Sequence, residues 1–254
     1  MSRSPLHSSL ACAPLDTQAD LHDNLHPEVW HAHTLATPVA QVLATGVEEL
    51  DAQLPGGGWP VGALTELLQA PNHHCEWRLL TPALAHCGTA AVVLVAPPHI
   101  PMCPALAAQG VASQRLVCVH SAAAAQRLWA AEQALRCAGV DAVLAWLPQA
   151  RADQLRRLQM AASEYNRLLF VMRPNTARQE SSPAVLRLII EPGGGGPEWR
   201  GDTLQVHVFK RRGPTMAHAL AFAAPHAGLA QLLAAAHYPN QVLESHHALD
   251  RAAA

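Results

Sequence analysis

Lysine is nearly absent from the sequence: Lys210 is the only one among 17 basic residues, and arginine supplies the rest of the positive charge. Any chemistry that needs a lysine must therefore use Lys210. The formal net charge is −2, which argues against a broad electrostatic contact with nucleic acid, because cations that neutralise phosphates supply most of that affinity. A local arginine patch stays compatible with this composition.

Long hydrophobic runs are also absent. The longest, Ala90–Ala96, falls far short of the roughly 20 apolar residues that a membrane-spanning helix needs. Residues 1–30 contain no basic segment followed by an apolar stretch, so no secretory signal is predicted. We therefore expect a soluble, cytoplasmic protein with no membrane partner.

Paired cysteines are missing as well. The six cysteines show no CxxC spacing, which argues against a disulfide framework or a zinc site. Residues 73–75 (His-His-Cys) and 86–87 (His-Cys) carry metal-ligating groups, but such clusters arise by chance among 16 histidines. Zinc prefers two clearly spaced pairs of ligands. We expect no metal site and no cofactor.

The chain has 254 residues, and 50% of them are hydrophobic, which is enough for one large domain with a buried core. Residues 1–25 are polar with little periodicity and residues 237–254 end in an alanine tail, so both are expected to be flexible tails. We assign the core to residues 26–215 and a helical segment to residues 216–236.

Short apolar runs alternate with alanine-rich segments of helical period across this core, a pattern typical of an α/β fold. The runs are continuous, which predicts a mostly parallel sheet with helices on both faces. The clearest predicted helices are Ala122–Cys137, ended by Gly139, and Asp153–Tyr165, with Asp153 as its N-cap. The predicted strands are Ala63–Leu68, Ala90–Ala96, Leu116–His120, Ala142–Leu147 and Leu168–Met172.

The pattern changes after the fifth strand. Residues 173–183 are polar and bounded by prolines, which predicts an exposed loop. Val185–Ile190 and Leu204–Phe209 flank a glycine run and predict a C-terminal antiparallel hairpin at the sheet edge. Residues 216–236 are expected to form one or two helices broken near Pro225, whose apolar side chains either pack on the sheet or bind a partner. These side chains are Leu220, Phe222, Leu229, Leu232 and Leu233.

The most informative stretch is Leu54–Leu68, with the sequence Leu-Pro-Gly-Gly-Gly-Trp-Pro-Val-Gly-Ala-Leu-Thr-Glu-Leu-Leu. We interpret Gly56–Gly58 and Trp59 as a tight turn with an anchoring aromatic side chain rather than as a ligand contact. The buried strand that follows leads into residues 69–76 and then a helix. Such a strand-to-helix turn is where backbone N–H groups bind phosphate.

This stretch resembles the lead-in to the ATP-binding loop of RecA-like recombinases, and the resemblance continues over most of residues 45–215. It implies a RecA-like, P-loop-type core. A phosphate loop needs glycines and a lysine, yet Cys75 and Glu76 stand where lysine and threonine would be. The magnesium aspartate falls at Trp146, and the catalytic acid falls near Pro97–Pro98. The degenerate phosphate-loop positions are Gln69, Ala70, Pro71, Asn72, His73, His74, Cys75 and Glu76.

We therefore expect no catalytic residue and no ATP hydrolysis, because three separate parts of the ATPase are missing. A residual ATPase with an unusual loop would instead make hydrolysis sensitive to replacement of Glu66 or Glu76.

His26–Leu35 together with Leu54–Leu68 looks like the N-terminal half of the ImuA family, and the match covers residues 26–215. The resemblance implies a non-catalytic adaptor in SOS-induced translesion DNA synthesis, a mutagenic form of DNA repair. Its partners would be a Y-family-like ImuB protein, an error-prone C-family polymerase and RecA, and RecA protomer contacts make self-association reasonable. The alternative is a SulA-like inhibitor that binds the tubulin-like division protein, which cell filamentation on overexpression would reveal.

The candidate nucleic-acid surface consists of basic residues on the predicted polar loop and on the turn after the last core strand. In RecA-like recombinases the corresponding loop contacts single-stranded DNA. Glu180 lies on the same loop, so a solvated surface and a DNA contact both remain open. The basic residues are Arg173, Arg178, Lys210, Arg211 and Arg212.

Overall fold

The computed structural model describes residues 41–193 and 203–223. The predicted tails and the motif at His26–Leu35 lie outside the described residues, as do Leu229, Leu232 and Leu233. Within the described segments, no helix has both the length and the apolar character needed to cross a membrane.

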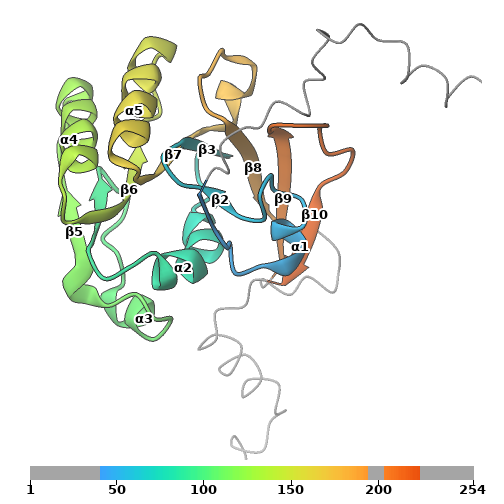
Figure 1. Ribbon diagram of the computed structural model, residues 1–254, viewed down its shortest axis with the longest axis horizontal. Helices are drawn as coiled ribbons and strands as arrows, with labels where there is room; N and C mark the ends of the chain where they lie inside the picture. Colours follow the sequence, from blue (N-terminus) through green and yellow to red (C-terminus); the bar gives the residue numbers. More distant parts are fainter. Residues whose placement is uncertain (1–40, 194–202, 224–254) are drawn as a thin grey trace, which may run out of the picture. The chain divides into compact units, whose positions relative to one another are not determined.

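Eight strands form the main sheet: β3 (Leu64–Gln69), β4 (Ala91–Val95), β5 (Leu116–Val119), β6 (Val140–Trp146), β7 (Leu168–Pro174), β8 (Leu186–Pro192), β9 (Thr203–Lys210) and β10 (Leu220–Ala223). Their order is β10-β9-β8-β3-β7-β6-β4-β5 (Figure 1). From β8 to β5 in this order, all of the strand pairs are parallel. At the other end of the sheet, β9 pairs antiparallel with both β8 and β10. The predicted α/β fold, with a mostly parallel sheet and a C-terminal antiparallel hairpin, is confirmed.

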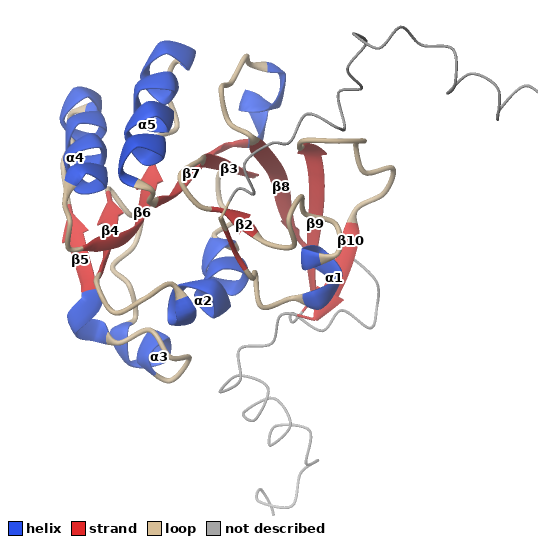
Figure 2. Cartoon of the chain, viewed as in Figure 1, coloured by secondary structure: helices blue, strands red, loops and turns tan. Residues whose placement is uncertain are grey.

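Helices cover both faces of this sheet (Figure 2). One face carries α2 (Glu76–His86) and α3 (Cys103–Ala107), and the other carries α4 (Ala124–Arg136) and α5 (Ala152–Tyr165). From β3 through β4 to β5 the chain moves toward one edge of the sheet, and from β5 through β6 and β7 to β8 it moves back. Because crossovers between parallel strands are right-handed, the helices of these two parts of the chain lie on opposite faces. Each face has its own core, one around Leu67 and Leu79 and the other around Val143 and Leu158.

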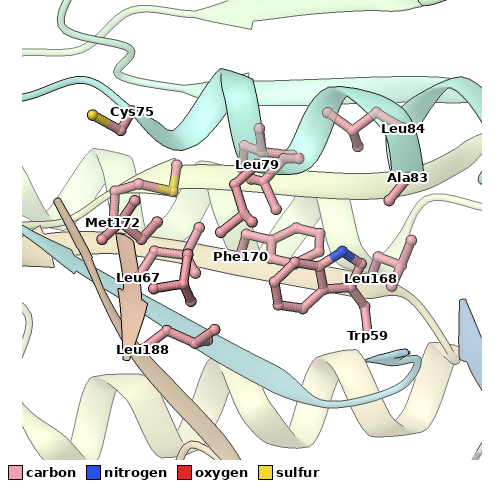
Figure 3. Close-up of a cluster of buried hydrophobic side chains, with 14 of the residues drawn as sticks. Trp59, Leu67, Cys75, Leu79, Ala83, Leu84, Leu168, Phe170, Met172 and Leu188 are labelled. Carbon is pink, nitrogen blue, oxygen red and sulfur yellow. The ribbon is translucent and has the colours of Figure 1, made fainter. Parts of the chain in front are cut away.

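A small hairpin precedes the main sheet. Its strands are β1 (Val42–Leu43) and β2 (Trp59–Pro60), with the short helix α1 (Glu48–Asp51) between them. Trp59 is fully buried and meets the Phe170 ring edge-on, with the ring centroids 5.4 Å apart (Figure 3). A Cβ on Gly58 would lie 2.3 Å from the carbonyl oxygen of Leu43, so the hairpin requires glycine there. These contacts support the structural interpretation of the glycine turn and its tryptophan.

Two strand predictions need correction. β5 is an edge strand, paired only with β4 among the described residues, so Val117 and Cys118 are exposed rather than covered on both faces. The hairpin of β8 and β9 does not form the sheet edge, because Leu220–Ala223 pairs with β9 as strand β10. The predicted helix over residues 216–236 is therefore wrong at Leu220 and Phe222, and Phe222 packs into the core at 7% exposure.

The helix boundaries also differ in detail from the prediction. Helix α4 ends at Arg136, before Cys137 turns to an extended conformation, so Gly139 does not terminate it. Helix α5 begins at Ala152, and the backbone N–H of Arg151 donates to the Gln154 side chain at 2.9 Å. Asp153 therefore lies in the first turn rather than at the N-cap.

Candidate functional site

The loop predicted as a degenerate phosphate site joins the middle of the sheet to a helix. β3 lies between β7 and β8, and all of its residues are buried. The chain leaves β3 at Gln69 and enters α2 at Glu76. This is the strand-loop-helix arrangement in which a phosphate loop occurs, because the backbone N–H groups of the loop and of the helix N-terminus converge there.

The side chain of Glu76 is buried and hydrogen-bonded inside this loop. Its side chain is 1% exposed, and its Oε2 accepts a hydrogen bond from Gln69 Nε2 at 2.9 Å. Its Oε1 accepts one from the indole N–H of Trp146 at 3.2 Å. Gln69 Oε1 in turn accepts the backbone N–H of Cys75 at 3.2 Å. We call these side chains the Gln69–Glu76–Trp146 network.

The network lies between a parallel strand and the N-terminus of a helix, which is the arrangement in which nucleotide-binding proteins hold phosphate. Glu76 lies in the first turn of α2, so its negatively charged carboxylate interacts favourably with the positive end of the helix dipole. The neighbouring Cys75 is buried, and burial raises the pKa of its thiol. Neither residue supplies a cation, and a buried carboxylate repels a phosphate chain.

A cavity of about 670 Å³ opens at the carboxyl edge of the parallel strands. Ligands of open α/β sheets bind at this edge, in the crevice where neighbouring connections leave in opposite directions. The neighbouring strands β4 and β6 show this divergence, since the connection after β4 leads to α3 on one face and the connection after β6 leads to α5 on the other (Figure 2). The polar side chains that line the cavity are Gln69, His73, His74, His120, Ser121, Arg127 and Arg173.

Sequence reasoning placed the loop residues of this cavity but missed His120, Ser121 and Arg127. His120 and Ser121 directly follow β5, and Arg127 lies in the first turns of α4. Their position after a parallel strand was the signal that could have identified them, since residues at that edge meet across the sheet.

The predicted exposed loop begins with a buried residue, which is a correction. Arg173 belongs to β7, and its side chain is 1% exposed. Its guanidinium reaches Glu66 Oε1 at 3.4 Å and Glu180 Oε2 at 2.6 Å. Arg187 Nε donates to Glu66 Oε2 at 2.5 Å, and Ser182 Oγ donates to Glu66 Oε1 at 3.0 Å. The guanidinium of Arg173 is therefore held by ion pairs within the sheet and does not lie on an exposed loop.

The other basic candidates differ in exposure and in the bonds that their side chains make within the protein. Lys210 Nζ donates to the carbonyl of Ser182 at 2.7 Å, and burial, followed by the nearby Arg187 charge, lowers the pKa of Lys210. Arg211 donates to the carbonyl oxygens of Gln53 and Pro214. The exposed residues are Arg178, whose guanidinium lies 5.5 Å from the centre of the Phe209 ring, and Arg212.

The described residues include no group of three or more His, Cys, Asp or Glu side chains placed to hold a metal ion. No protein-family model matches the chain, and no match to a curated protein is found.

Proposed function

We propose that this chain is a non-catalytic, RecA-like accessory protein of SOS-induced translesion DNA synthesis, similar to the ImuA family. It would assemble with a Y-family-like ImuB protein, an error-prone C-family polymerase and RecA, and act in the cytoplasm. The resemblance of Leu54–Leu68 to the RecA-like lead-in supports this function. The closed loop that follows this motif supports it further.

The observation that carries the proposal is the Gln69–Glu76–Trp146 network. A RecA-type ATPase needs a lysine on the β- and γ-phosphates and a carboxylate that holds Mg²⁺. Here the lysine position holds a buried cysteine, and the end of β6 holds Trp146 in place of a carboxylate. Both oxygens of the nearest carboxylate, Glu76, accept hydrogen bonds from protein side chains.

An adaptor keeps the scaffold of its family and works through its surfaces. The sheet, its two helical layers and the core around Trp59 are complete although the phosphate loop is not. A core without a nucleotide site supports a role in assembly, because function depends on specific sites rather than on the fold.

Co-purification tests the proposal. The full chain, co-expressed with the ImuB protein, is expected to form a complex that survives size-exclusion chromatography, and the error-prone polymerase is expected to join it. The tubulin-like division protein serves as the comparison partner. Binding to the division protein with no retention of ImuB would overturn the proposal and favour the SulA-like alternative.

A further inference from the structure

A cavity lies beside the loop at residues 69–76, although that loop lacks the glycines and the lysine that a phosphate site needs. It spans the ends of several parallel strands, from the loop after β3 to the segment after β5. Its volume of about 670 Å³ falls within the range of small-molecule sites, which measure roughly 300–1,000 Å³. A site of this size holds a compact organic molecule.

Most of the surface that the cavity presents is apolar. Trp146 and Met172 form part of its inner wall, at the ends of β6 and β7. Prolines at or after the ends of the strands contribute much of the remaining apolar lining, together with three alanines; the prolines are Pro71, Pro97, Pro98, Pro148 and Pro174. Such a wall favours a ligand with an apolar body, because binding removes apolar surface from water.

The charged residues in the lining are both cationic. Arg127 is half-buried, and it donates to the carbonyl oxygens of Ser121 at 2.7 Å and Ala122 at 3.2 Å. These bonds hold its guanidinium at the cavity wall. Arg173 lies in the wall, and its Nε–H is buried with no hydrogen-bond partner among the residues that the structure describes.

No carboxylate belongs to the described lining of the cavity. Glu76 lies behind Gln69 and Trp146, and the donors of these two side chains occupy its oxygens. Glu66 and Glu180 likewise face Arg173. The electrostatic balance at the wall therefore favours an anion over a cation.

We infer that this cavity binds a small molecule with one anionic group, a carboxylate or a phosphate monoester, on an apolar body. Arg127 would receive the anionic group, and the proline-lined wall would receive the body. A polyphosphate chain does not fit this chemistry, since the loop after β3 offers neither glycines nor a lysine. The inference stands on the cavity itself and does not depend on the adaptor role.

Fluorescence titration of the full chain with anilinonaphthalene sulfonate, an aromatic anion, tests the inference. We expect saturable binding of one dye per chain. Arg127→Gln should weaken this binding about tenfold or more, because a hydrogen bond to a charged group contributes about 1.5–3 kcal/mol. Ala122→Trp, which adds bulk to the lining without changing its charge, should also weaken it. The matched control is Arg156→Gln, since Arg156 is an exposed arginine on α5 outside the lining.

Competition and a neutral probe complete the test. Uncharged phenylnaphthylamine should respond to Ala122→Trp but not to Arg127→Gln. Displacement of the anionic dye by phenylbutyrate identifies a carboxylate ligand, and displacement by phenyl phosphate identifies a phosphate monoester. Dye binding that neither pocket substitution weakens, or that neither competitor displaces, would overturn the inference. Retained ImuB binding in that case would leave the proposed function intact.

Discussion

Glu66 shows how a single residue organises the interior of the sheet. It is fully buried on the central strand β3, and Arg173, Arg187 and Ser182 donate to its carboxylate. Arg187 also donates to the carbonyl oxygens of the segment between β7 and β8. The cluster therefore ties that segment to the sheet, and its charges depend on each other because water does not reach them.

Replacement of Glu66 should destabilise the protein strongly. Glu66→Gln leaves Arg173 and Arg187 without their buried countercharge, and breaking a buried ion pair in this way costs about 3–5 kcal/mol of unfolding free energy. Urea denaturation measures this change. Asp153→Asn, which breaks the exposed pair of Asp153 with Arg151, is the control and should leave the midpoint unchanged. Equal midpoints for the two variants would contradict this account of Glu66.

Cysteine reactivity reports on the closed loop. Cys75 is 8% exposed and burial raises the pKa of its thiol, so at neutral pH it should react slowly with a thiol reagent. Cys137 is exposed and should react faster than Cys75. Mass spectrometry of the native protein during labelling gives the order, and unfolding in denaturant should abolish the difference. Labelling of Cys75 as fast as Cys137 in the native protein would show that the loop opens readily.

At the scale of the elements, the hairpin of β1 and β2 precedes β3 and packs against the main sheet. Trp59 packs from β2 onto Phe170 of β7, and Gly58 allows the backbone of β2 to approach Leu43 closely. The motif that resembles the RecA-like lead-in therefore has a packing role of its own. It fixes the start of the strand that ends at the Gln69–Glu76–Trp146 network.

A methyl group at Gly58 should disturb this hairpin. Gly58→Ala places a Cβ against the backbone of Leu43, so we expect a loss of about 1–3 kcal/mol of stability, as in other overpacked sites. Gly139→Ala is the matched control, because a Cβ there meets nothing within 4 Å. Thermal unfolding compares the two variants. A melting temperature for Gly58→Ala equal to that of the control would contradict the close approach.

The strands that lie inside the sheet could be predicted because both of their faces are covered. β3, β4, β6 and β7 read as continuous apolar runs and appear within a few residues of their predicted bounds. β10 could not be predicted, since its Ala- and Leu-rich sequence favours a helix locally. Pairing with β9 and burial of Phe222 override that preference.

The site was predictable in position but not in its bonding. The loop Gln69–Glu76 lies between β3 and α2 as expected. The hydrogen bond from Trp146 to Glu76 joins positions 70 residues apart in the sequence, and no local pattern encodes it. Arg173 appeared exposed because its neighbours in the sequence are polar. The useful signal was Glu66, a charged residue in an apolar strand, which requires a buried partner.

At the scale of the whole molecule, the scarcity of lysine now has a structural meaning. Lys210 is bonded to the carbonyl of Ser182, and its pKa is lowered mainly by burial, so it belongs to the scaffold rather than to a phosphate site. The molecule has an α/β sheet, the loop after β3 contains the buried, hydrogen-bonded carboxylate of Glu76, and an apolar cavity lies beside that loop. These features are the basis for the proposal that the protein assembles with others rather than hydrolyses ATP.

Calorimetric titration of the full chain with Mg²⁺ and ATP tests the central claim most directly, because the claim is that the Gln69–Glu76–Trp146 network occupies the phosphate site. We predict no saturable heat up to about 1 mM nucleotide, which corresponds to binding weaker than about −4.1 kcal/mol. A dissociation constant in the micromolar range would contradict the account.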